Sequence, residues 1–267
     1  TVFITNMVMS VLLFCVMFFG APVIASFFNR PQLIPLTKVM ASVVIINAFA
    51  IIQRTILVKK VDFKTQTKVS AIASVASGVV GIGMASGGLG VWSLVGQQLS
   101  RQFLNSLFLW VFAKWYPKLQ FSLKSFKELF NFGWKLMVSG LIDTVWREIY
   151  QVVIGKFYSP ATLGQYTRAH QFGSIFSTNL TAVVQRVSYP VLSEIQDDVP
   201  KLKNEYKKVI KVTMLITFCC MLGMAAIAEP MIVSLIGDQW LPAVPFLQIL
   251  CFSMMLYPLH AINLNML

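Results

Sequence analysis

Long apolar stretches alternate with short basic ones along the chain, and each apolar stretch has about the 20 residues that a helix needs to cross a bilayer. In the first part of the chain this pattern predicts four membrane-spanning helices, at residues 5–28, 33–58, 67–86 and 91–113. The last two are joined by a glycine-rich turn. No strand precedes these glycines and no Lys-Ser/Thr pair follows them, so they do not form the pattern of a phosphate-binding loop.

The third predicted span carries a row of small residues. Ala73, Ser77, Gly81 and Ala85 follow one another at four-residue spacing. Residues four apart share one face of a helix, and small side chains let a neighbouring helix approach closely. We therefore expect this face to pack against another helix.

The character of the chain changes after residue 113. Residues 114–131 mix lysines with aromatic residues and place Phe126, Leu129 and Phe130 on one side of a short helix. Such a helix is typical of a segment that lies along the membrane surface. We interpret it as a cytoplasmic linker between a first domain, 1–113, and a second, 132–267.

Four further apolar stretches follow the linker, and they predict spans at 132–158, 161–195, 209–237 and 240–267. The pattern as a whole predicts an all-α, polytopic membrane protein with eight transmembrane helices in two bundles.

The fifth predicted span carries charges near its middle. Asp143 and Arg147 stand four residues apart and share a helical face, whereas Glu148 points about a quarter turn away. Charged residues at that depth are costly and are kept with a partner or in a polar cavity. Two interpretations stay open: an ion pair that locks helix packing, or a polar face that lines a solute pathway.

The sixth predicted span is unusually polar. Its polar residues recur at alternating spacings of four and three, which makes one stripe along a helix. Within a membrane such a stripe either joins two helices or faces water, and its length favours water. The stripe consists of Thr167, Gln171, Ser174, Thr178, Thr181, Gln185 and Ser188.

Composition agrees with a membrane protein. The chain has 267 residues, of which 57% are hydrophobic and 12% are charged, and its mean hydropathy is +0.71; a soluble domain has about 25% charged residues. The net charge is +12, but the basic residues are sorted into loops between apolar spans, which argues against nucleic-acid binding. The four cysteines lie in apolar runs without paired spacing, so we expect neither a metal site nor a cofactor.

The basic residues also predict the topology. Fifteen lysines and arginines fall in three segments, 54–68, 114–135 and 193–211, whereas the intervening hairpins hold four. Because cytoplasmic loops carry an excess of lysine and arginine, we expect these three segments to be cytoplasmic. The chain begins at Thr1 and stops at Leu267 inside a predicted span, so we also expect it to be an internal piece of a longer protein.

Several strings carry a family resemblance: LVKKVDFKTQTKVS, GGLGVWSLVGQQL, SFKELFNFGWKLMVSGLIDT, VIGKFYSPATLGQYTRAHQF, QRVSYPVLSEIQDD and WLPAVPFLQILCFSMMLYPLHAINLN. They resemble the bacterial polysaccharide flippases of the O-antigen and colanic-acid (Wzx-like) type, within the MOP exporter superfamily. The resemblance covers essentially the whole chain. It implies a MOP/MATE-like fold of two facing six-helix bundles, with four helices of each present here.

The resemblance further implies a function. Proteins of this family move an oligosaccharide linked to undecaprenyl pyrophosphate from the cytoplasmic to the outer leaflet of the inner membrane, by alternating access. The implied partners are the lipid-linked oligosaccharide and membrane lipids, and a partnership with the polysaccharide polymerase machinery stays open. We expect no enzymatic activity.

A pyrophosphate head group needs cations within the membrane, and the planar guanidinium of arginine suits it. Arg101, with Gln97 and Asn105 on its face, has no acidic residue within a helical turn and is the strongest candidate for a cavity cation. Arg147 and Arg186 are further candidates, although Arg186 could equally reach the cytoplasmic interface.

The remaining candidates complete the expected cavity. Gln171, Thr178 and Gln185 on the polar stripe would contact sugar hydroxyls or water. Asp143 and Glu148 are candidates for coupling transport to protons or sodium ions, because a membrane carboxylate can change protonation when its surroundings change.

Two other function classes remain as alternatives. A drug or metabolite cation antiporter of the same superfamily would share the architecture but would favour an acidic cavity. A membrane-bound glycan polymerase or ligase would need a catalytic group of residues in a sizeable external loop, and the predicted outer hairpins are short.

Overall fold

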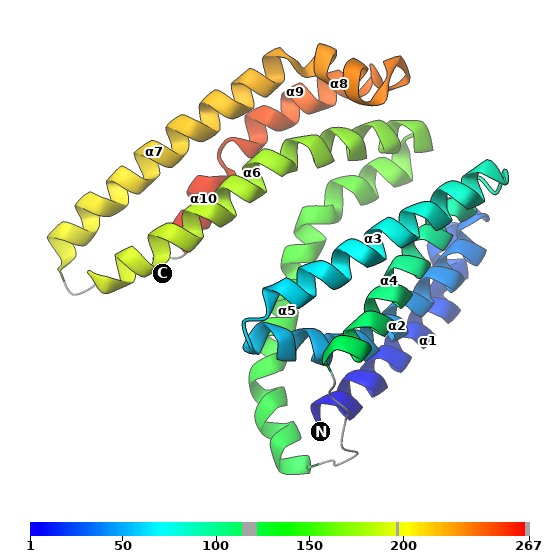
Figure 1. Cartoon of the computed structure of the whole chain (residues 1–267). Coiled ribbons are helices and arrows are strands. Elements are labelled where there is room, and N and C mark those ends of the chain that lie inside the picture. The colour runs from blue at the N-terminus through cyan, green and yellow to red at the C-terminus, as the bar shows by residue number, and fades with distance from the viewer. Residues whose placement is uncertain (114–121, 196–197, 265–267) are drawn as a thin grey trace. The chain divides into compact units, whose positions relative to one another are not determined.

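The computed structural model describes residues 1–113, 122–195 and 198–264 (Figure 1). Within these ranges the description excludes the side chains of residues 128, 129, 132, 182, 185–191, 193, 194, 260, 261, 263 and 264.

The described residues form helices joined by short turns, without a strand among them (Figure 1). The all-α prediction is therefore confirmed. The helices are α1 (Val2–Phe27), α2 (Leu33–Lys59), α3 (Phe63–Ser86), α4 (Val91–Ala113), α5 (Leu123–Phe157), α6 (Pro160–Glu194), α7 (Val199–Ala226), α8 (Ala228–Ile236), the 3-10 helix η1 (Asp238–Trp240), α9 (Ala243–Met254) and α10 (Tyr257–Leu264).

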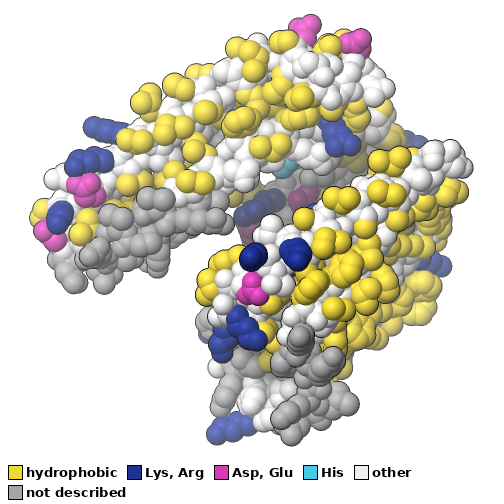
Figure 2. Space-filling model, in the orientation of Figure 1, with side chains coloured by type: hydrophobic (Ala, Val, Ile, Leu, Met, Phe, Trp, Pro, Cys, Tyr) yellow, Lys and Arg dark blue, Asp and Glu magenta, His cyan; other side chains and the backbone are white. Residues whose placement is uncertain are grey.

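Four of these helices are long and apolar enough to cross a membrane: α1, α2, α3 and α7. Their outer surfaces carry exposed large apolar side chains, such as Phe19 (76% exposed), Val75 and Ile82. Figure 2 shows hydrophobic side chains spread over the visible surface of both parts of the chain. Apolar surface of this extent belongs in lipid rather than water. Eight membrane-spanning helices are expected from the sequence pattern, and four of the described helices have the length and apolar composition to cross a membrane.

The chain divides into two compact units, Thr1–Trp146 and Arg147–Leu267. The division falls within α5. The predicted linker, 114–131, lies partly outside the described residues, and the part that is described does not form a separate helix. It is instead the first segment of α5, which runs on into the predicted fifth span without an intervening proline.

In the first unit, α3 packs against α4, and α2 packs against α1 and α4. The buried residues of α3 are Val69, Ala73, Ser77 and Gly81, at the predicted four-residue spacing, while Ala85 is exposed. A Cβ atom on Gly81 would lie 3.0 Å from Cβ of Gln97 on α4. The small-residue face therefore brings α3 close to α4, and Gly81 sets the approach at Gln97.

In the second unit, α6, α7 and α9 pack against one another, and α8 contacts α7 and α9. The core consists of fully buried Met221, Ile232, Leu247 and Cys251 with their neighbours. Cys251 is thus a packing residue.

Two predicted spans of this unit are interrupted. The 209–237 span is divided between α7 and α8, and the 240–267 span contains α9 and α10. The breaks follow from proline, whose ring clashes with the carbonyl group four residues earlier. Ala226, the last residue of α7, lies four before Pro230, and Met254, the last of α9, lies four before Pro258.

Candidate functional site

An arginine lies near the middle of α4. Gln97, Arg101 and Asn105 stand four residues apart and share one face of the helix, as predicted. Arg101 is exposed, whereas Gln97 and Asn105 are half-buried. In the part of the chain that the structure describes, Arg101 forms no ion pair or hydrogen bond. Its guanidinium group is therefore available to an anion.

The charges of α5 lie on an exposed stretch. Every described side chain from residue 134 to residue 150 is exposed, including those of Asp143, Arg147 and Glu148. The Glu148 carboxylate accepts a hydrogen bond from the Gln151 side-chain amide. The continuous helix places Asp143 and Arg147 on one face, one turn apart.

The polar stripe of α6 follows one edge of its buried face. Gln171 and Thr178 are exposed, Thr167 and Ser174 are half-buried, and Thr181 is buried at 4% exposure. The hydroxyl groups donate to carbonyl groups one turn earlier on the same helix: Thr178 to Ser174 and Thr181 to Ser177. The stripe is therefore divided between residues that pack and residues that are open. The side chains of Gln185 and Ser188 in the stripe, and that of Arg186, lie outside the described residues.

The first half of α6 contacts the turn around η1, which the sequence pattern does not predict. The Arg168 guanidinium carbon lies 5.4 Å from the centre of the Trp240 ring, and Nη1 donates to Oε1 of Gln171 (3.0 Å). Nε2 of Gln165 donates to the carbonyl oxygen of Gln239 (3.2 Å). Arginine and glutamine on α6 thus hold the turn that contains η1.

The described residues hold no group of three or more His, Cys, Asp or Glu side chains that could bind a metal ion. The candidate residues form three sets on three helices: Gln97 and Arg101 on α4, the charged residues of α5, and Gln171 with Thr178 on α6. Exposed cations and amide or hydroxyl groups of this kind can bind an anion and polar groups attached to it.

Residues 1–245 match the family described as "Polysaccharide biosynthesis protein". The chain belongs to this family. The resemblance found in the sequence is therefore confirmed, and with its apolar helices this member of the polysaccharide biosynthesis family is a multi-pass membrane protein.

Curated relatives cover most of the chain. It is 27% identical to the teichuronic acid biosynthesis protein TuaB of Bacillus subtilis over 94% of its length and 52% of that protein. It is 24% identical to the succinoglycan biosynthesis transport protein ExoT of Rhizobium meliloti over 95% of its length and 51% of that protein. The lipopolysaccharide biosynthesis protein WzxC of Escherichia coli is 23% identical over 94% of this chain and 51% of its own length.

The chain thus spans about half the length of the curated relatives that it matches. No solved structure matches it. The names of these relatives describe biosynthesis and transport of polysaccharides.

Proposed function

We propose that the chain is part of a flippase that moves undecaprenyl-pyrophosphate-linked oligosaccharide repeat units from the cytoplasmic to the outer leaflet of the inner membrane. The observation that carries this proposal is the family match over residues 1–245, together with relatives named for three different polysaccharides. Different polysaccharides contain different sugars, but their precursors can be attached to the same lipid carrier. The carrier is therefore the feature that a site common to these proteins would recognise.

The exposed guanidinium of Arg101 supports an anionic carrier. It lies on α4, which this proposal places in the membrane, with amides on the same face. Arginine stays charged there and pairs with phosphate oxygens through two parallel hydrogen bonds. Arg147 is the second proposed phosphate ligand, and Arg186 remains a prediction.

The α6 residues suit the glycan. A hydroxyl group that donates its proton to the backbone, as in Thr178, still has lone pairs that accept from a sugar hydroxyl. The exposed Gln171 adds an amide that can both donate and accept. We assign these two residues, with Gln97, to glycan contacts.

The transport cycle needs alternating access and an energy source. We propose Asp143 and Glu148 as coupling carboxylates, since a carboxylate that changes its surroundings can bind and release a cation. In this topology the basic segments 54–68, 114–135 and 193–211 face the cytoplasm.

The test uses the full-length parent protein in cells that lack their own flippase. Arg101→Ala and Arg147→Ala are made separately, with Arg101→Lys to retain the charge and Arg54→Ala, at an exposed position of α2, as the matched control. Surface glycan is measured beside the amount of membrane-inserted protein.

We expect each alanine variant to lose surface glycan at normal protein level, the lysine variant to retain part of it, and the control to export normally. Normal export by both alanine variants would show that neither arginine is needed to bind the carrier. Failure of the wild-type protein to restore surface glycan, combined with altered resistance to cationic drugs, would favour the antiporter.

A further inference from the structure

The first part of α7 concentrates positive charge. Residues 198–211 contain five lysines and two carboxylates, and from Val212 to Ala226 the helix has no charged residue. An α-helix of 28 residues is about 42 Å long, and about 20 residues cross the hydrocarbon layer. The uncharged part of α7 has 15 residues and is about 22 Å long, which is shorter than the hydrocarbon layer. The long side chains of the lysines before it can therefore reach the lipid head groups when α7 spans the membrane.

Both carboxylates in this segment are already engaged. Asp198 caps α7, its Oδ1 accepting from the backbone nitrogen of Lys201 (3.1 Å). Oε1 of Glu205 pairs with Nζ of Lys208 (2.7 Å). Among the described residues, Lys203, Lys207 and Lys211 have no acidic partner.

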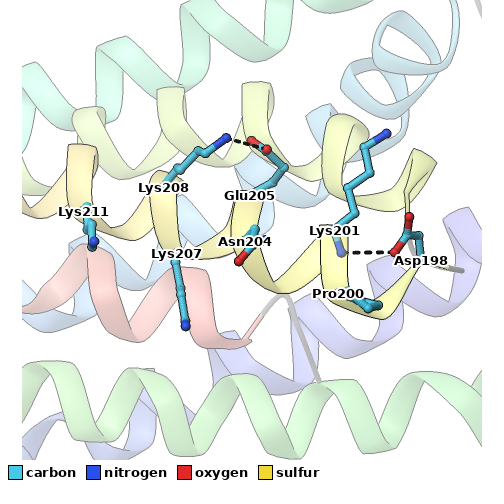
Figure 3. Close-up of a pocket in the computed structure, with 8 residues that line it drawn as sticks. All are labelled: Asp198, Pro200, Lys201, Asn204, Glu205, Lys207, Lys208 and Lys211. Carbon is cyan, nitrogen blue, oxygen red and sulfur yellow. Dashed lines mark hydrogen bonds and ion pairs between the residues drawn. The ribbon is translucent and has the colours of Figure 1, made fainter.

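These three lysines, which we call the lysine row, stand at four-residue spacing and are exposed. Like charges at this spacing on a helix repel one another. Figure 3 shows Lys207 pointing away from Lys208 and Glu205, which point toward each other. Lys207 and Lys208 thus point in different directions although they are neighbours in the sequence.

A hollow of about 560 Å³ lies against this part of α7. It is lined by Asn204, Lys207 and Lys211, and also by the engaged Asp198, Glu205 and Lys208. Lys203 is not among its lining residues. Asn204 adds an amide donor beside the ammonium groups (Figure 3). A head-group phosphate can accept from both kinds of donor, and it would remove the repulsion within the lysine row.

We propose that the lysine row binds the phosphate of anionic phospholipids in the surrounding bilayer, separately from any transported lipid. Lysines next to a membrane span are attracted to anionic lipid, each by about 1 kcal/mol, which is about a fivefold change in affinity. The proposal needs only that α7 lies in a bilayer, so it can be tested whether or not the transport proposal holds.

The experiment titrates the full-length protein in neutral detergent with phosphatidylglycerol or phosphatidylcholine and follows bound lipid by native mass spectrometry. The test variant is K203Q/K207Q/K211Q. The matched control is K59Q/K60Q/K64Q, which removes three exposed lysines near the turn between α2 and α3. Circular dichroism and size-exclusion chromatography confirm that both variants fold.

We expect tighter binding of phosphatidylglycerol than of phosphatidylcholine by the wild type, and a loss of about fivefold per lysine removed in the test variant. The control should lose less affinity, because the Asp62 carboxylate already offsets the charge of Lys60 and Lys64. Equal losses in both variants, or none in the test variant, would overturn the proposal. A third titration uses undecaprenyl pyrophosphate, and a loss confined to that lipid would assign the lysine row to the transported carrier instead.

Discussion

Arg168 on α6 lies over the ring of Trp240, with its guanidinium carbon 5.4 Å from the ring centre. The two residues are far apart in the sequence, and their contact joins α6 to η1 in the second unit. A cation over the face of an indole ring is attracted by about 0.5–1 kcal/mol at exposed sites. We expect Arg168→Ala and Trp240→Ala each to lower the unfolding free energy of this unit. The double variant should lose less unfolding free energy than the two single variants lose together.

The measurement is unfolding in detergent micelles of the two single variants and the double variant, from which the coupling energy follows. Trp240→Phe serves as the control that keeps an aromatic face, and it should retain part of the coupling. Strict additivity would show that the contact contributes nothing to stability.

A second contact, which includes the buried Gln53, joins α2 to α4 in the first unit. Nε1 of Trp110 donates to the Phe49 carbonyl oxygen (2.9 Å). The Gln53 side chain is fully buried, and in the amide orientation that gives both its oxygen and its nitrogen a partner, the oxygen accepts from the same Trp110 nitrogen (3.1 Å). We expect Gln53→Leu to lower the unfolding free energy by about 0.5–2 kcal/mol, because a buried hydrogen bond is lost. Thermal unfolding in detergent checks this. Asn47→Leu, at an exposed position of α2, should not lower stability.

Much of the fold could be predicted from hydrophobic spacing. The helix bounds predicted at 33–58, 91–113 and 161–195 correspond closely to α2, α4 and α6, although of these three helices only α2 is long and apolar enough to cross a membrane. The helix breaks at Pro230 and Pro258 could not be predicted from the prolines alone, because Pro22 lies inside α1 and does not end that helix. Whether a proline ends a helix depends on the packing around it, which the sequence pattern does not contain.

The candidate site was predictable only within each helix. Spacing placed Gln97, Arg101 and Asn105 on one face, and the structure agrees. Spacing did not separate buried Thr181 from exposed Thr178, because that difference depends on which neighbouring helix covers α6. For the same reason, the contact between Arg168 and Trp240 has no signal in the local sequence.

The close approach of α3 and α4 predicts the effect of a methyl group. A Cβ atom at position 81 would lie 3.0–3.2 Å from Cβ, Cγ and Cδ of Gln97. We expect Gly81→Ala to destabilise the first unit by about 1–3 kcal/mol and to displace Gln97. Gly78→Ala is the matched control, since its Cβ would meet nothing within 4 Å. Equal thermal stability of the two variants would contradict the close approach.

The turn after α2 contains a strained valine. Val61 has φ 57°, in the left-handed region that a β-branched residue rarely adopts. The backbone nitrogen of Asp62 donates to the Leu57 carbonyl oxygen (2.9 Å), which closes a Schellman motif around Val61. Val61→Gly should therefore raise the unfolding free energy by about 1 kcal/mol. Val61→Ala, which keeps a Cβ atom, should give little of this gain in the same thermal unfolding assay.

The N-terminus of α3 should respond to pH through Asp62, in the turn between α2 and α3. Oδ1 of Asp62 accepts from the backbone nitrogen of Thr65 (3.1 Å), and this hydrogen bond lowers the pKa of the carboxyl group below its ordinary value of 3.8, with a further contribution from the Thr65 side chain. A carboxyl group with a lowered pKa in the folded state stabilises that state above its unfolded pKa, and the contribution is lost as the pH falls through the folded pKa.

We therefore expect Asp62→Ala to reduce thermal stability at neutral pH, and the difference from the wild type to shrink as the pH falls below about 4. Asp62→Asn keeps an oxygen acceptor but cannot titrate, so its stability relative to Asp62→Ala should not change over this range. Circular dichroism melts in detergent between neutral pH and the lowest pH at which the protein remains folded give both comparisons. A difference between wild type and Asp62→Ala that stays constant with pH would show that the carboxylate does not cap α3.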